Sequence, residues 1–255
     1  MAVDSPLHQF QIETFYQGPQ FDIGGVHFDM SITNSVAAML LAVGLTLFFF
    51  LLSTMRASII PGRMQVMAEG IFGLVDDLTE SIIGHDGKQF FPYVFALFLF
   101  ILSCNLVGMF TIFTATSQVA VTLTLAAMTM ALVLLVGFIR HGLGFFKLFA
   151  PSGVPWYIMP VLVPIEIIAF LVRPVTLTLR LFGNMVGGHI VLKVFAGFIL
   201  SAAAIGAAGW AIGALSLGTM VALTTLEFLV AYLQAFVFAV LACVYLSDVV
   251  NIGHH

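Results

Sequence analysis

The chain has 255 residues, of which 61% are hydrophobic and only 8% are charged, and its formal net charge is −4. Soluble domains carry about 25% charged residues, and the mean hydropathy of this chain is +1.15. The composition therefore excludes an ordinary soluble domain and predicts an integral membrane protein.

Three apolar runs are long enough to cross a bilayer. They contain no charged residue and cover 33–55, 90–113 and 117–139. Because a helix of about 20 residues spans a hydrocarbon core of about 30 Å, we expect a transmembrane helix at 33–55 and a transmembrane hairpin at 90–139. Residues 1–32 precede the first span as a separate N-terminal segment.

Basic residues indicate the orientation of these spans. Segment 1–32 contains no Lys or Arg. It therefore lacks the basic region of a signal peptide, and we expect no signal peptide here. Basic residues instead follow the first span and the hairpin, at Arg56, Arg63, Lys88, Arg140 and Lys147. Taken as cytoplasmic under the positive-inside rule, they place segment 1–32 outside and the C-terminus inside.

Segment 64–84 has the pattern of an amphipathic helix. Its apolar residues recur every three or four positions, at Met64, Met67, Ile71, Leu74, Leu78 and Ile82. The acidic residues fall largely opposite, at Glu69, Asp76, Asp77 and Glu80. Helices that bind anionic lipid present basic residues instead. We therefore expect an interfacial helix whose acidic face either binds a basic protein partner or is solvated.

The region 155–250 predicts two helices that are too long for upright spans. Segment 219–247 has 29 residues without Gly or Pro, which corresponds to a helix of about 44 Å. Such a helix must tilt by about 45° to stay within the apolar core. Segment 160–198 is similarly long, and a Gly- and Ala-rich turn around 201–213 joins the two. Four shorter spans are the alternative, although 225–240 lacks the turn residues that they need.

These patterns together predict an all-α integral membrane protein. It has an N-terminal spanning helix, an interfacial amphipathic helix, a helical hairpin and two long, strongly tilted membrane helices. The two cysteines, Cys104 and Cys243, lie in apolar runs and are expected to be small buried hydrophobes rather than a disulfide.

Polar side chains gather on the two long helices. They are Glu166, Arg173, Arg180, Asn184, His189 and Lys193 on the first and Glu227, Gln234, Tyr245 and Asp248 on the second. An ionisable group inside a bilayer is costly, so its default interpretation is functional. Arg180 cannot be neutralised and has no acidic neighbour within two turns, so its counter-charge must come from Glu227 or from another subunit. Gly183 and Gly187 form a small-xxx-small pair, which lets another helix approach beside it.

Structural interpretations remain open for several of the other polar residues. Arg173 and Lys193 lie near the expected helix ends, where long basic side chains can snorkel to the interface. Glu166 can pair with Arg173 two turns later. Asn184 and Gln234 can be ordinary interhelical hydrogen-bond partners.

The residues around Arg180 also form a recognisable signature. The stretch Leu179-Arg-Leu-Phe-Gly-Asn-Met-Val-Gly-Gly-His189 is preceded by Glu166 and Arg173-Pro174 and is followed by Leu233-Gln-Ala-Phe-Val-Phe238. This pattern resembles the subunit a family of rotary F-type ATP synthases, and the resemblance covers nearly the whole chain. It implies a membrane stator that lies against a c-ring of small hairpin subunits, each with one buried carboxylate. The b-type subunits of a peripheral stalk are further implied partners.

The resemblance implies a proton path through this chain. Protons reach the ring through an outer half-channel and leave through an inner one, and Arg180 separates the two. His189 and Glu227 resemble the relay of the outer half-channel. In some family members the imidazole and the carboxylate are exchanged between the two helices, and a relay needs only two exchangeable groups within reach. Histidine suits this task because it changes charge near neutral pH.

The same resemblance suggests positions along the two half-channels for the remaining polar residues. Glu166 lines the inner half-channel, Asn184 lines the outer one, and Gln234 faces the essential arginine. Other candidates for channel lining are Arg173, Tyr245 and Asp248.

Other chemistry finds little support in the sequence. No His-Glu-x-x-His motif or Cys/His spacing indicates a metal, and no glycine-rich loop indicates a nucleotide. We therefore expect no metal, no cofactor and no catalytic centre in this chain, because ATP is made in other subunits of the complex. We expect lipid and protons, but no nucleic acid, as partners.

Two functions of other classes remain as alternatives. An ion-coupled secondary transporter places its site in inverted repeats, but the Arg180 region has no repeat in 30–140. A passive scaffold leaves the buried charges unexplained. We expect a bacterial plasma membrane rather than the inner mitochondrial membrane.

Overall fold

The computed structural model describes most of the chain. The described residues are 14–23, 26–29, 31–55, 58–84, 86–110, 115–142, 144–145, 157–202 and 207–251. Predictions for residues 1–13, Arg56 and Lys147 fall outside these ranges. The chain divides into two compact units. The first comprises Met1–Thr46, Ile101–Gln118 and Leu181–Gln234, and the second comprises Leu47–Phe100, Val119–Arg180 and Ala235–His255.

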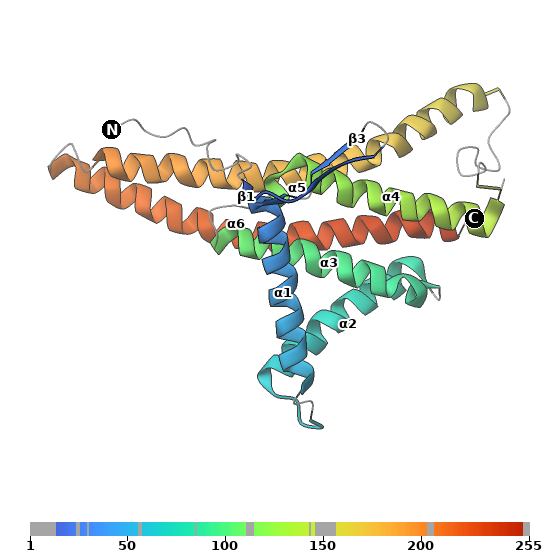
Figure 1. Ribbon diagram of the computed structural model, residues 1–255, viewed down its shortest axis with the longest axis horizontal. Coiled ribbons are helices and arrows are strands. Elements are labelled where there is room, and N and C mark those ends of the chain that lie inside the picture. The colour runs from blue at the N-terminus through green and yellow to red at the C-terminus, as the bar shows by residue number, and fades with distance from the viewer. Residues whose placement is uncertain are drawn as a thin grey trace. The chain divides into compact units, whose positions relative to one another are not determined.

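Helices make up most of the described chain (Figure 1). They are α1 (Asn34–Met55), α2 (Arg63–Ile83), α3 (Gly87–Phe110), α4 (Val119–His141), α5 (Met159–Ala202) and α6 (Ala207–Val250), with a short 3-10 helix at Ala115–Ser117. Five of these α-helices, all except α2, are long and apolar enough to cross a membrane. The protein is therefore an integral membrane protein built mainly from helices, as predicted.

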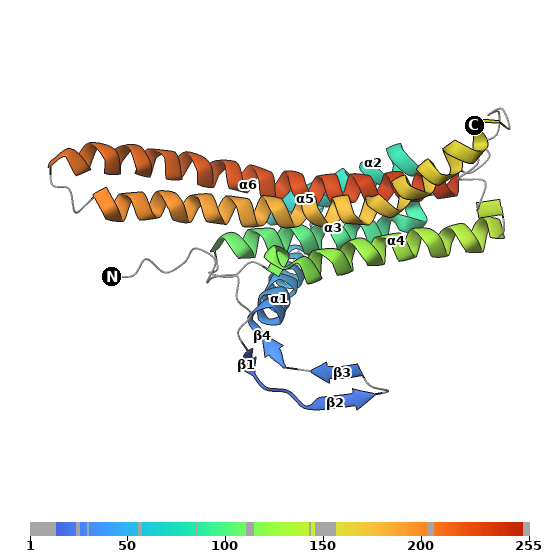
Figure 2. The ribbon, with the colours of Figure 1, turned by 90° about the horizontal axis from the view of Figure 1, so that it is seen from above.

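The last two helices, α5 and α6, have 44 residues each, which corresponds to about 66 Å of helix. The alternative of four shorter spans is therefore wrong. The predicted turn at 201–213 was too long, because α5 continues to Ala202 and α6 begins at Ala207. Alanine is the best helix former, so this Ala-rich stretch extends α6. Within the first unit the two helices run side by side in both views (Figures 1 and 2). Their tilt in a bilayer stays a prediction.

Four short strands precede α1, which the sequence patterns did not predict. They are β1 (Thr14–Tyr16), β2 (Gln20–Ile23), β3 (Val26–Asp29) and β4 (Ile32–Thr33). β1 pairs with β4, and β2 pairs with β3, both antiparallel; Figure 2 shows the second pair as a hairpin. In the second pair, Ile23 lies opposite Val26 and Gln20 lies opposite Asp29.

A buried polar contact joins three elements of the first unit. The Asn105 side chain on α3 is fully buried, and its Nδ2 donates to the carbonyl oxygen of Ala231 on α6 at 3.2 Å. Its Oδ1 accepts from the hydroxyl of Thr116, which lies in the 3-10 helix, at 2.9 Å. Buried polar groups need such partners. This contact therefore sets the position of α6 one turn beyond Glu227.

The second unit has an apolar core to which α2 contributes. The fully buried side chains include Val75, Phe98, Val133, Phe238 and Leu246. The α2 residues that pack inward are Ala68, Val75, Thr79 and Ile83, which lie one position after the stripe predicted from 64–84. Small Ala and Thr side chains allow close packing, whereas Met64 and Met67 stay exposed. The helix itself lies where it was predicted, but its packed stripe differs, and its interfacial location stays a prediction.

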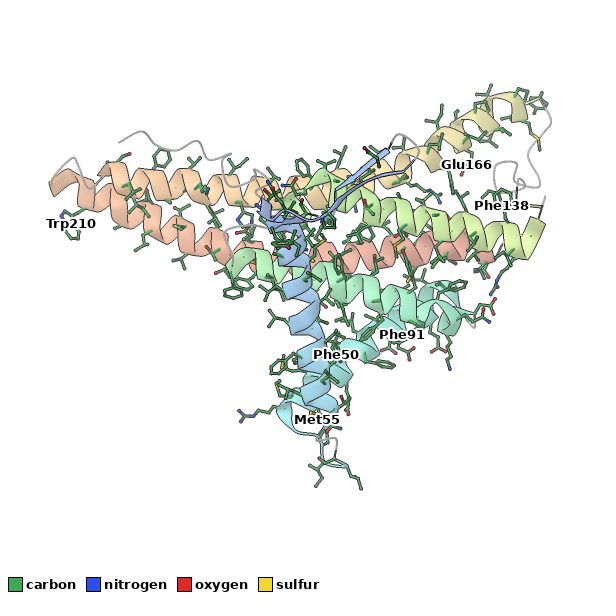
Figure 3. All side chains as sticks on the ribbon, in the orientation of Figure 1. Phe50, Met55, Phe91, Phe138, Glu166 and Trp210 are labelled. Atoms are coloured by element: carbon green, nitrogen blue, oxygen red, sulfur yellow. The ribbon has the colours of Figure 1, made fainter. Side chains whose placement is uncertain are left out.

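Large apolar side chains cover the outside of the helices. Met55 at the end of α1 is 78% exposed, and Trp210 near the start of α6 is 84% exposed. Both point away from the ribbon in Figure 3. Soluble proteins rarely expose contiguous apolar surface of this kind, so these faces fit lipid or partner subunits.

Candidate functional site

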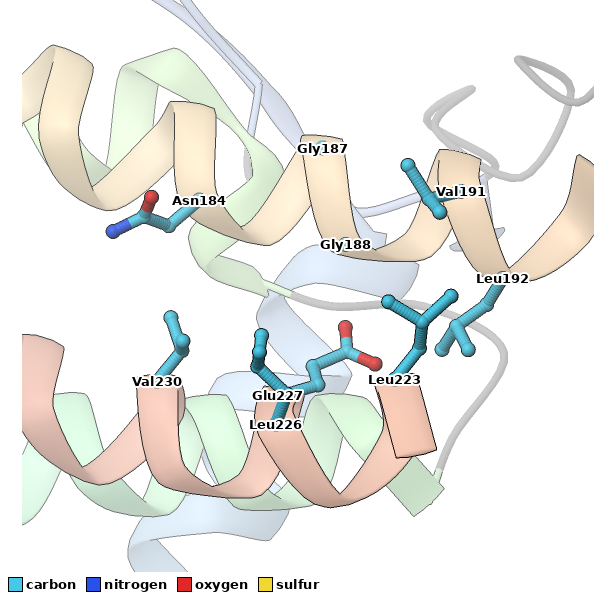
Figure 4. Close-up of a pocket in the computed structure, with 9 residues that line it drawn as sticks. All are labelled: Asn184, Gly187, Gly188, Val191, Leu192, Leu223, Leu226, Glu227 and Val230. Carbon is cyan, nitrogen blue, oxygen red and sulfur yellow. The ribbon is translucent and has the colours of Figure 1, made fainter. Parts of the chain in front are cut away.

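In the first unit, α5 and α6 enclose a pocket of about 220 Å³ (Figure 4). Its lining is mostly apolar and includes an amide and a carboxylate; the residues are Asn184, Gly187, Gly188, Val191, Leu192, Leu223, Leu226, Glu227 and Val230. A carboxylate beside an apolar pocket at membrane depth is costly unless it has a function or a partner. The pocket therefore marks the candidate site.

The predicted pair of His189 and Glu227 is brought together at this site. Nε2 of His189 on α5 lies 3.8 Å from Oε1 of Glu227 on α6, and their side chains are only 16% and 6% exposed. This separation suits an ion pair when the imidazole is protonated, but it exceeds hydrogen-bond distance. Oε1 of Glu227 accepts no hydrogen bond within the described part of the chain. The two groups are thus close enough to exchange a proton after a small movement.

Gly188 permits the close approach of the carboxylate to α5. A Cβ atom at this position would lie 2.7 Å from Oε1 and 3.2 Å from Cδ of Glu227, so the carboxylate could not keep its present position beside α5. In Figure 4 the carboxylate of Glu227 points toward the α5 backbone at Gly188. A Cβ atom at Gly183 or Gly187 would meet nothing within 4 Å among the described residues. The sequence pattern singled out these two, whereas the glycine that the site requires is the second of the Gly187-Gly188 pair.

Asn184 and Gln234 also meet in the first unit. Nδ2 of Asn184 donates to Oε1 of Gln234 at 2.8 Å, and Gln234 is only 4% exposed. Nε2 of Gln234 is buried and donates to no acceptor among the described residues. The predicted interhelical hydrogen bond is confirmed, and it leaves one amide donor available.

Arg180, in contrast, is exposed on α5. It makes no hydrogen bond or ion pair with the residues that the structure describes. Glu227 lies next to His189. The counter-charge of Arg180, from Glu227 or from another subunit, stays a prediction.

A second polar cluster lies in the second unit. Nη1 of Arg173 donates to Oδ2 of Asp248 at 2.9 Å. The guanidinium carbon lies 4.8 Å from the centroid of the Tyr245 ring and 5.6 Å from that of Phe170. The structure thus joins three candidates that the sequence left separate. Arg173 pairs with Asp248, so its pairing with Glu166 was wrong; Glu166, labelled in Figure 3, is half-buried on α5.

Two positions near the site were missed by sequence reasoning. Asn105 binds the backbone of α6 at Ala231, and Gly188 leaves room for the Glu227 carboxylate beside α5. The signal for Asn105 was an amide inside the apolar run 90–113, since amides in membrane helices commonly form interhelical hydrogen bonds.

Comparison with known proteins covers almost the whole chain. The family model described as ATP synthase A chain matches residues 36–247. The chain is 47% identical to the ATP synthase subunit a of Mesorhizobium japonicum, over 100% of both chains. It is 48% identical to that of Chelativorans sp., over 100% of both chains, and 48% identical to that of Hyphomonas neptunium, over 100% of this chain and 99% of the relative. Identity at this level over the full length shows that the chain belongs to the ATP synthase subunit a family.

Proposed function

We propose that this chain is the membrane stator of a rotary ATP synthase, which carries protons to and from the carboxylates of a c-ring through two half-channels. The observation that carries the proposal is the pair of His189 and Glu227, 3.8 Å apart beside a pocket between α5 and α6. Membership of the subunit a family supports the same function.

The pair of His189 and Glu227 serves as the relay of the outer half-channel. An imidazole accepts and releases a proton near neutral pH, and the carboxylate next to it accepts that proton in turn. Asn184 lines the pocket beside Glu227, and its hydrogen bond to Gln234 continues the polar path along the two helices. The chain offers an imidazole and a carboxylate rather than a cage of oxygen ligands, so the transported ion is H⁺ rather than Na⁺.

Arg180 separates the two half-channels. Its exposure on α5 leaves the guanidinium accessible to a partner subunit. A permanent cation favours the ionised form of a ring carboxylate, so it removes the proton from each arriving carboxylate and blocks a direct leak. Such a leak would dissipate about 2.3 kcal/mol per proton for each 100 mV of membrane potential.

The remaining assignments follow from the same function. Glu166 lines the inner half-channel, and b-type subunits of a peripheral stalk hold the stator in place. ATP is made in other subunits, and this chain has no catalytic centre of its own. The relatives compared above are bacterial, which supports a location in a bacterial plasma membrane.

Replacement of Arg180 tests the proposal. At an effective dielectric constant of 20, two charges 4 Å apart attract by about 4 kcal/mol, which corresponds to roughly a thousandfold in rate. We therefore expect Arg180→Ala to abolish ATP-driven acidification of liposomes that contain the complete synthase. Arg180→Lys will not rescue it, because the ammonium is more strongly hydrated and can lose its proton when buried.

The matched control is Arg63→Ala, which removes another exposed arginine at the start of α2. This control should pump at nearly the normal rate. Normal acidification by Arg180→Ala would remove the arginine from the mechanism. A secondary transporter, by comparison, would transport its substrate in liposomes without any ring of hairpin subunits.

A further inference from the structure

We propose that Asp248 is the internal counter-ion of Arg173, with the ring of Tyr245 packed on the guanidinium, so that only Arg180 of the two arginines on α5 is left to bind a ring carboxylate. This inference rests on the proposed function of the chain as a stator. It makes Asp248 a residue that determines which arginine acts.

The two arginines lie on the same stripe of one helix. They are seven residues apart on α5, which is continuous between them. Seven residues of α-helix correspond to two turns less about 20°, with a rise of about 10.5 Å. Both arginines belong to the second unit. A partner surface that follows this stripe would therefore meet both guanidinium groups in turn.

Their surroundings differ in charge and in packing. Arg173 donates to Asp248 at 2.9 Å, and its side chain is 23% exposed. Its guanidinium carbon lies 4.8 Å from the Tyr245 ring centroid, within the distance of a cation–π contact. Arg180 is exposed and has no hydrogen bond or ion pair in the described part of the chain. One charge is thus neutralised in place, and the other remains available.

Asp248 is poorly placed for any role in α6 itself. It lies in the last turn of this helix, which ends at Val250, and a negative charge at a helix C-terminus is unfavourable. The neighbouring Ser247 donates from its hydroxyl to the carbonyl oxygen of Ile82 at 2.9 Å. This bond anchors the end of α6 to the end of α2, which holds Asp248 opposite Arg173.

An unpaired Arg173 would compete with Arg180 for the ring. A ring carboxylate that leaves Arg180 in ionised form would meet a second free cation about 10.5 Å further along the helix. That cation would stabilise the ionised carboxylate and hold it there, so each step of the ring would slow. Neutralisation of Arg173 by Asp248 removes this competing site.

The test uses the complete synthase in liposomes, with ATP-driven acidification as the measurement. We expect Asp248→Asn to pump roughly tenfold more slowly, because it leaves an uncompensated charge, while the ring still co-purifies. Arg173→Gln combined with Asp248→Asn removes both charges and should recover to within about threefold of normal. Asp248→Glu should recover similarly, because it keeps the carboxylate.

A second arginine–aspartate pair in the same unit provides the matched control. Arg140 binds Asp86, and the guanidinium carbon lies 5.6 Å from the centroid of the Phe90 ring. This pair resembles that of Arg173 in composition, but neither of its residues is on α5. Asp86→Asn should therefore leave acidification within about twofold of normal, because Nη2 of Arg140 keeps its hydrogen bond to Oε1 of Gln89 at 3.0 Å.

The outcomes distinguish this inference from the proposed function. If Asp248→Asn pumps normally while Arg180→Ala is inactive, only the inference fails. If Arg180→Ala pumps normally, the proposed function fails as well. A double variant no faster than Asp248→Asn would show a structural ion pair and would overturn the inference. If neither Asp248→Asn nor the double variant assembles, the inference is overturned in the same way. If only the double variant assembles and pumps, the inference is supported.

Discussion

The two polar clusters on α5 and α6 differ in how completely their groups are paired. In the first unit, His189 and Glu227 lie 3.8 Å apart beside a pocket, and Oε1 of Glu227 lacks a hydrogen-bond donor among the described residues. In the second unit, Arg173 has a hydrogen bond of 2.9 Å to Asp248 and a cation–π contact. Full pairing stabilises one charge state, whereas proton transfer needs a group that accepts a new partner. The incompletely paired cluster is therefore the one suited to exchange.

Between these two clusters, the larger effect is expected from removal of either member of the incompletely paired one, His189 or Glu227. General acid–base groups contribute about 10²–10⁴-fold to rates, so His189→Ala and Glu227→Gln should each slow proton flux by roughly 100-fold. Because the two groups face each other, the combination of His189→Glu with Glu227→His should restore part of the flux. The gain should be non-additive, as for groups in contact.

The measurement is proton flux through stator and ring in liposomes, compared for both single variants and the exchanged pair. Recovery will be partial, because each side chain acquires the desolvation of the other's position. If the flux of the exchanged pair is reduced by the product of the two single reductions, direct transfer between the groups is contradicted. Near-normal flux in both single variants would leave Asn184 and water to carry the proton.

A smaller loss of proton flux is expected when a methyl group is added at Gly188, next to the Glu227 carboxylate. Gly188→Ala places a Cβ atom where only 2.7 Å separates it from Oε1 of Glu227. The carboxylate must then move away from α5, so we expect flux to fall by about tenfold, which corresponds to about 1.4 kcal/mol. Gly187→Ala is the matched control, since its Cβ atom would meet no described residue within 4 Å. Equal losses in both variants would show a general effect on the helix.

Much of the fold could be predicted from the sequence, because long uncharged apolar runs define membrane helices. The first three spans and the two long helices were found in this way. The N-terminal strands were missed because they are only two to four residues long, below the length at which alternation is informative. The packed stripe of α2 was displaced by one position, because packing selected small residues over Met64 and Met67.

The candidate site was predicted less completely. The residue types on α5 and α6, with the family signature, indicated His189 and Glu227 as a pair. Contacts between distant residues cannot be read from spacing on one helix: Arg173 and Asp248 lie 75 positions apart in the chain. Gly188 could not be distinguished from Gly187 either, because only the position of the Glu227 carboxylate decides which glycine is required.

A third prediction concerns Asn105 on α3, which holds α6 one turn beyond Glu227. Asn105→Leu removes the donor to the carbonyl oxygen of Ala231 and the acceptor of the Thr116 hydroxyl. A buried group left without its partner costs about 1–3 kcal/mol, so we expect this loss in the free energy of unfolding. Addition of Thr116→Val should cost little more, since it removes the orphaned hydroxyl. Denaturant unfolding of the single and double variants measures this, and fully additive losses would contradict a direct contact.

The smallest effect is expected in the fully paired cluster. The Tyr245 ring lies 4.8 Å from the Arg173 guanidinium carbon, and a cation–π contact of this kind contributes about 0.5–2 kcal/mol. Tyr245→Leu should therefore lower the free energy of unfolding by about 1 kcal/mol beyond its loss of apolar packing. Tyr245→Phe keeps the ring and serves as the control, and it should retain most of the stability. Because the ion pair with Asp248 persists in both variants, the difference between them isolates the ring. Equal unfolding midpoints for the two variants would show that the Tyr245 ring contributes nothing to the stability of this cluster.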